Sequence, residues 1–174
     1  VLVMNRFGPM VVRYLSRTVG LTGDVTRSVM TSHMADAARA RYQPEGRLNE
    51  TAVGFQYMRP YIATSVNSWE ESDGMSPMGW NLDKDGMVAA LLLAAMVLHE
   101  GATPEELLEA LEAELGTYHF ERRKVTGTIG GEALSAALAQ RFGQAASGDR
   151  LEVAGRRFVV DRLITLDGYK VVLE

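Results

Sequence analysis

The residues best suited to chemistry lie in the stretch 69–74, which reads WEESDG. Glu70 and Ser72 are two positions apart, so on an extended segment their side chains point to the same side. One carboxylate can accept hydrogen bonds from two neighbouring hydroxyls of a sugar, and a serine adds a donor. The pattern therefore favours recognition of a hydroxylated ligand, although an acidic loop facing solvent would have the same composition.

Two other groups of residues resemble known chemical sites but lack features that those sites require. Residues 31–33 (Thr-Ser-His) place a nucleophile next to a base, but adjacent side chains do not face each other, and a helix N-cap explains them. Residues 81–86 resemble the start of a calcium-binding EF-hand loop, but the twelfth position is Leu92 where a bidentate Glu is required. We therefore predict that Asp85 caps a helix, and the three scattered histidines show no metal-ligand spacing.

Composition narrows the class of protein. The 174 residues are 47% hydrophobic and 23% charged, as in folded globular domains, and the net charge of −4 argues against a nucleic-acid partner. There is no cysteine, which excludes a disulfide framework and cysteine-ligated zinc and fits a cytoplasmic location. The longest apolar run, 87–98, is shorter than the ~20 residues that cross a bilayer, so we expect no membrane partner.

Periodicity and cap signals predict the elements that must position these residues. We expect a long exposed loop over 67–83 and, after it, a helix to His99 that is apolar on every face and hence buried on both sides. The remaining expected elements are helices over 5–18, 33–42, 103–115 and 130–142, strands over 24–30, 48–53 and 62–66, a linker at 144–149, and a hairpin of 157–166 with 169–173.

Four motifs in order resemble one enzyme family. Residues 50–57 (ETAVGFQY), 69–74 (WEESDG) and 83–86 (DKDG) before an apolar helix resemble the third domain of the α-D-phosphohexomutases, the phosphoglucomutase/phosphomannomutase enzymes. Residues 165–170 (TLDGYK) resemble the first hairpin of that family's fourth domain. The resemblance implies an α/β fold: a three-layer α/β/α domain with a small mixed sheet over 1–128, then a helix and β-hairpin of a partial α+β domain over 129–174.

The resemblance also implies a function for the parent protein. Such enzymes interconvert hexose 1-phosphate and hexose 6-phosphate through a phosphoserine and a bisphosphate intermediate, with magnesium and a bisphosphorylated sugar activator. Their third domain holds the sugar hydroxyls, which by motif position gives Glu70 and Ser72 this role, with Val53, Gly54 and Lys84 also lining the site. The partners implied are a hexose phosphate and the parent's other domains.

Departures from the family pattern are equally informative. Trp69 replaces the usual glycine of the loop, where it would either stack on the sugar or block its approach, and Gln56 replaces a frequent lysine. The serine, metal-binding and phosphate-binding loops of the family are absent, and the chain starts at Val1 rather than Met. We therefore expect a fragment without catalytic residues, bound cofactor or mutase activity of its own.

The alternatives are a non-catalytic sugar-phosphate-binding module and a mutase acting on a phosphopentose or an amino-sugar phosphate. The loop residues alone do not separate these substrates from a hexose phosphate. We expect Glu70 and Ser72 to project from one side of the loop and Glu71, facing away, to be dispensable.

Overall fold

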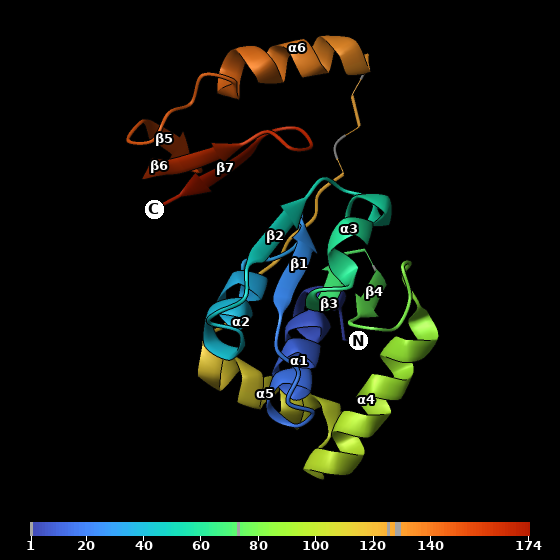
Figure 1. Ribbon diagram of the computed structural model, residues 1–174. Coiled ribbons are helices and arrows are strands. Elements are labelled where there is room, and N and C mark those ends of the chain that lie inside the picture. The colour runs from blue at the N-terminus through green and yellow to red at the C-terminus, as the bar shows by residue number, and fades with distance from the viewer. Residues whose placement is uncertain (1, 73, 125, 128–129) are drawn as a thin grey trace. The chain divides into compact units, whose positions relative to one another are not determined.

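The computed structural model describes residues 2–72, 74–124, 126–127 and 130–174, which form two units, Val1–Glu121 and Arg122–Glu174. The domain boundary expected between residues 128 and 129 lies outside the described residues, as does Asp73 of the acidic motif. Each unit has its own sheet (Figure 1).

The first unit is built on a four-stranded sheet. Its strands are β1 (Asp24–Ser28), β2 (Leu48–Thr51), β3 (Ser65–Glu70) and β4 (Gly74–Pro77), in the order β2-β1-β3-β4. The first three are parallel and β4 runs antiparallel to β3, so the sheet is mixed, as predicted. The carboxyl ends of the three parallel strands therefore meet at one edge.

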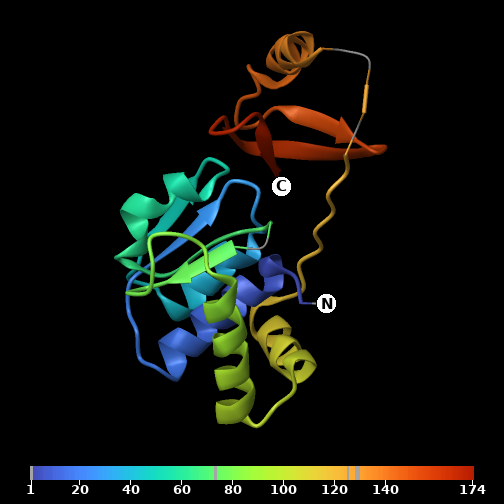
Figure 2. The same ribbon diagram turned by 90° about the vertical axis from the view of Figure 1, so that its right-hand side faces the viewer.

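Helices cover the sheet and complete a three-layer α/β/α domain. The main core lies where α1 (Met4–Arg17) and α2 (Met34–Tyr42) pack on the sheet, and a smaller cluster of Phe55, Met58 and Ile62 lies around α3. The smaller cluster belongs to a short 3₁₀ turn (Phe55–Tyr57) and to α3 (Arg59–Ile62), which packs on β1 and β3. Outside α1 and α2 lies α5 (Pro104–Leu115), with α4 (Gly86–Glu100) beside it (Figure 2).

An ion-pair network ties the helices together. Arg13 of α1 binds Glu100 of α4 at 2.8 Å and Glu114 of α5 at 3.2 Å, and Glu114 also accepts from Arg17 and Tyr42. Burial opposes the charge on Glu114, but the hydrogen bonds from Tyr42 and the two arginines outweigh it, so its pKa is lowered. Burial, and then the bond to Glu114, raises the pKa of Tyr42 to about 12.

The prediction of an exposed loop over 67–83 was wrong for 67–70 and 74–77, whereas residues 79–83 are exposed and outside any helix or strand, as predicted. Residues up to Glu70 and from Gly74 to Pro77 form the β3–β4 hairpin, and every residue of β3 is buried. The strand expected over 62–66 is also misplaced, because α3 extends to Ile62 and β3 begins at Ser65. Strand β3 was missed because its sequence is polar. Asn67 donates to the carbonyl of Gly8, so this polar side chain makes an internal contact and does not face solvent.

Trp69 has neither of the roles considered from the sequence. Its side chain is fully buried in the main core against Gly8 of α1, so it neither stacks on a ligand nor shields the site from one. Gly8 permits this contact because it lacks a Cβ. Trp69 is therefore a core residue of the sheet.

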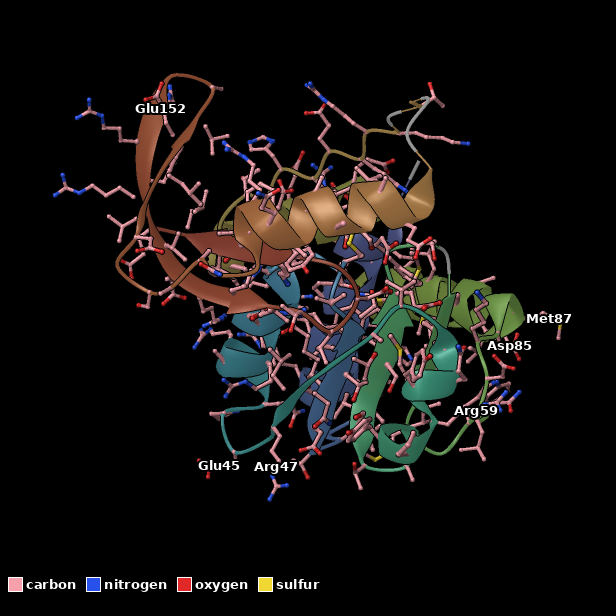
Figure 3. The ribbon with its side chains drawn as sticks, turned by 90° about the horizontal axis from the view of Figure 1, so that it is seen from above. Glu45, Arg47, Arg59, Asp85, Met87 and Glu152 are labelled. Atoms are coloured by element: carbon pink, nitrogen blue, oxygen red, sulfur yellow. The ribbon has the colours of Figure 1, made fainter. Side chains whose placement is uncertain are left out.

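A further correction concerns the burial of α4. Its cap is as predicted: the Asp85 carboxylate accepts from the backbone N–H of Met87, and the hydrogen bond from the Trp80 indole, followed by that backbone bond, lowers the pKa of Asp85. However, the helix packs along β4 and α5 on one side only, and Met87 and Leu98 are 73% and 80% exposed. Figure 3 shows Met87 at the outer end of α4.

Within the described residues no single helix is long and apolar enough to cross a membrane; only α4 and α5 taken together, which meet at 82°, reach that length and composition.

The second unit contains one helix and a three-stranded antiparallel sheet. Helix α6 (Gly131–Phe142) precedes β5 (Arg150–Val153), β6 (Arg156–Ile164) and β7 (Lys170–Leu173), in the order β5-β6-β7. The predicted helix and hairpin are both present, and Gly168 takes the positive φ of 88° that its turn requires. Strand β5, directly after the expected linker, was not predicted.

Candidate functional site

The candidate site is centred on Glu70, the last residue of β3. Its side chain is 3% exposed, yet its carboxylate is not isolated: Oε1 accepts from the backbone N–H of Gly54 at 2.7 Å, and Oε2 lies 3.6 Å from Nζ of Lys84. A buried charge is tolerated only with such partners. Three of the five residues proposed from the sequence are therefore brought into direct contact.

Gly54 supplies its N–H from the turn that follows β2. Its φ is +125°, a conformation that L side chains rarely adopt, and a Cβ there would lie 2.7 Å from the amide atoms of Gln56. The neighbouring Val53 is exposed at the same turn. The turn therefore requires glycine so that its backbone can reach the carboxylate of Glu70.

Lys84 reaches Glu70 from the segment before α4. Its side-chain methylenes lie across Gly74, where an added Cβ would be 2.9 Å from Lys84 Cβ and closer to its Cδ. The side chain is 47% exposed, so the stem rests on the backbone of β4 while the ammonium is open to solvent. This is the one cation in contact with Glu70 among the salt bridges of the described residues.

Glu71 is bound rather than free. Its Oε2 accepts from the hydroxyl of Ser28, the last residue of β1, at 3.0 Å, and Ser28 also bonds the hydroxyl of Thr31 at 2.9 Å. The sequence-based expectation that Glu71 is dispensable therefore has to be revised. Ser72 follows it and is exposed.

A buried ion-pair cluster lies next to this contact. Arg27 is 1% exposed and binds both carboxylate oxygens of Asp36, at 2.9 and 3.1 Å, and Glu50 at 2.6 Å. Asp36 is on α2 and Glu50 on β2, so one guanidinium joins three elements at the edge that carries the site. Arg27 stands out in the sequence as a charged residue in the middle of a predicted strand, but its partners lie far from it in the chain, so the sequence does not reveal them.

The acidic residues do not assemble a metal site in the part of the chain that the structure describes, where no group of three or more His, Asp or Glu side chains could hold an ion. Two of the three histidines are engaged elsewhere: His99 Nδ1 lies 2.6 Å from the hydroxyl of Tyr14, and His33 lies beside Asp36.

A family model identifies this fold and motif order. The model for the phosphoglucomutase/phosphomannomutase α/β/α domain III matches residues 4–115, nearly the whole first unit. The chain belongs to the phosphoglucomutase/phosphomannomutase family. The candidate residues, from Val53 to Lys84, all lie within the matched range.

Solved structures of this mutase family support the same fold. A protein described as a phosphomannomutase from Thermus thermophilus aligns with 99% of the chain at 22% identity and a TM-score of 0.72. The open form of the Paramecium phosphoglucomutase parafusin aligns with 100% of the chain at 18% identity and a TM-score of 0.62. The chain covers 33% and 37% of these two proteins, and it matches no curated protein sequence.

Proposed function

We propose that this chain supplies the sugar-recognition domain of a phosphohexomutase that interconverts hexose 1-phosphate and hexose 6-phosphate. The observation that carries the proposal is the buried carboxylate of Glu70, held by the Gly54 N–H and Lys84 within domain III of a mutase family. Family membership supports an isomerase as the parent; the substrate and the route through phosphoserine and a bisphosphate remain part of the proposal.

The geometry suits a ligand that binds in two orientations. A carboxylate offers about four acceptor positions, and the contacts with Gly54 and Lys84 use only one on each oxygen. Two adjacent sugar hydroxyls held by one carboxylate exchange places when the sugar turns over, so the same residue serves both half-reactions. Glu70 is thus the group that recognises the hydroxyls, and exposed Ser72 adds a donor or acceptor beside it.

Lys84 is the residue of this set that suits a phosphate. Its ammonium is partly exposed and its contact with Glu70, at 3.6 Å, is longer than a hydrogen bond. A ligand phosphate arriving at this edge would attract the ammonium as a point charge. We infer that Lys84 exchanges Glu70 for the substrate phosphate and thereby frees one carboxylate oxygen for a sugar hydroxyl.

The remaining machinery is assigned to other parts of the parent. The phosphoserine and magnesium loops belong to other domains, the activator is a bisphosphorylated sugar, and the second unit of this chain is the beginning of the phosphate-binding domain. The described residues contain no cluster that could hold the metal. We accordingly propose that the isolated chain binds a hexose phosphate without turning it over.

The test uses the full-length protein that contains this chain, assayed for conversion of glucose 1-phosphate and mannose 1-phosphate. Because a charged hydrogen bond is worth about 1.5–3 kcal/mol, Glu70→Ala should lower kcat/KM at least about tenfold, and Ser72→Ala by about fivefold. Glu70→Gln keeps an acceptor for the Gly54 N–H, so it shows the effect of losing the charge without losing that hydrogen bond. Glu109→Ala, an exposed glutamate of α5, is the control. Unchanged kcat/KM in a folded Glu70→Ala protein would refute the proposal.

A further inference from the structure

A chain of hydroxyls runs from the end of β1 to the acidic loop. Thr31 Oγ1 lies 2.9 Å from Ser28 Oγ, which lies 3.0 Å from Glu71 Oε2. Ser28 is fully buried and Thr31 is 3% exposed, so neither hydroxyl is left to solvent. Buried hydroxyls are costly unless they are paired, and here each has a partner.

The direction of the protons follows from the acceptor. A carboxylate accepts and does not donate, so Ser28 gives its single proton to Glu71. Ser28 can then only accept from Thr31. The order is Thr31 to Ser28 to Glu71, and it ends on a charged acceptor, which makes the last bond the strongest of the series.

Glu71, the middle residue of the segment 70–72, is therefore held by a hydrogen bond from β1. Glu70 on one side is held by Gly54 and Lys84, and Ser72 on the other is exposed and directly attached. A rotation of the backbone at Glu71 would move both neighbours. We propose that Ser28 and Thr31 are positioning residues: they hold Glu71, and through it they set the orientation of Glu70 and Ser72 for the sugar. The last clause rests on the proposed function, whereas the fixing of the loop does not.

The orientation of Glu70 can be followed without a ligand through the backbone N–H of Gly54. It donates to Glu70 Oε1 at 2.7 Å, so its hydrogen-exchange protection measures how firmly that carboxylate is held. In the ¹⁵N-labelled chain, Ser28→Ala and Glu71→Ala should each raise the exchange rate of the Gly54 amide at least about fivefold. Glu71→Gln retains an acceptor oxygen and should restore most of the protection. The double variant Ser28→Ala/Glu71→Ala should be no worse than either single variant.

Ser65→Ala is the matched control. Ser65 is equally buried and its hydroxyl is paired with Thr26 at 2.7 Å, but it lies at the opposite end of β3 from Glu70. It should lower the stability of the sheet to a similar extent while leaving the Gly54 amide unchanged. Equal effects of Ser65→Ala and Ser28→Ala on Gly54, or no effect of Ser28→Ala, would overturn the proposal.

A second arm separates this inference from the proposed function. The same labelled chain is titrated with glucose 1-phosphate, and Ser28→Ala should weaken binding at least about fivefold relative to Ser65→Ala. Absence of binding by the unmodified chain would count against the proposed function, while the Gly54 amide would still decide whether Ser28 fixes the loop. Binding that is equal in all variants would refute the positioning role in sugar recognition.

Discussion

Gly8 lies inside α1, directly against the indole of Trp69, and this contact makes a sharp prediction about stability. A Cβ at position 8 would come within 2.6 Å of three atoms of the indole, Cδ2, Cε2 and Nε1, and Trp69 is completely buried. In a helix interior, Gly→Ala normally stabilises by about 1 kcal/mol. Here the steric overlap between the new Cβ and the indole should cost about 1–3 kcal/mol, because the close-packed core prevents the ring from shifting. The gain in helix propensity offsets part of this cost, so we expect Gly8→Ala to destabilise the first unit by up to about 2 kcal/mol.

The assay is urea denaturation followed by tryptophan fluorescence. Both tryptophans of the chain, Trp69 and Trp80, lie in the first unit, so the signal follows its unfolding. The decisive comparison repeats Gly8→Ala in a Trp69→Leu background, where Trp80 still reports. Without the indole the steric cost disappears, and the substitution should be neutral or stabilising by up to about 1 kcal/mol. If Gly8→Ala stabilises the unmodified protein, or costs the same in both backgrounds, the close contact is not a determinant of stability.

Three further predictions follow from the polar contacts. Asp85→Ala should lower the urea midpoint of the first unit because α4 loses its cap, and Asp85→Asn should restore most of it. Arg27→Ala should destabilise by about 3–5 kcal/mol in the same assay, because two partly buried carboxylates lose their cation. The lowered pKa of Glu114 stabilises the fold above its unfolded value of about 4.3, and this contribution is lost as pH falls through the folded pKa. The stability difference between the unmodified chain and Glu114→Gln should therefore shrink between about pH 5 and pH 3; a constant difference would contradict the assignment.

Elements defined by local signals were predictable from the sequence. The Thr103 side chain and Glu106 form a capping box at the start of α5, and Gly101 ends α4 in the left-handed conformation. These motifs depend on residues within four positions of each other, so the local sequence determines them. The α/β/α fold was expected through the resemblance and was confirmed.

Burial was much less predictable than secondary structure. Strand β3 reads as a polar loop because the partners of Asn67 and Glu70 lie 59 and 16 residues away. Conversely, α4 is apolar on every face, and nothing in its sequence indicates that Met87 and Leu98 stay exposed within this chain. Apolar composition sets a preference for burial, but only the surrounding elements determine whether it is met.

In the candidate site, too, some residues could be predicted from the sequence and others only from the structure. Glu70, Gly54 and Lys84 could be named in advance because each belongs to a motif, and the structure brings them together. Ser28 could not, because its role depends on the register of β1 beside β3, where Arg27 lies opposite Trp69, one step before Ser28. That register places the end of β1 next to the acidic loop and brings Ser28 to Glu71, 43 residues away. Motifs therefore identify the residues that we propose to meet a ligand, whereas strand pairing determines which residues contact them.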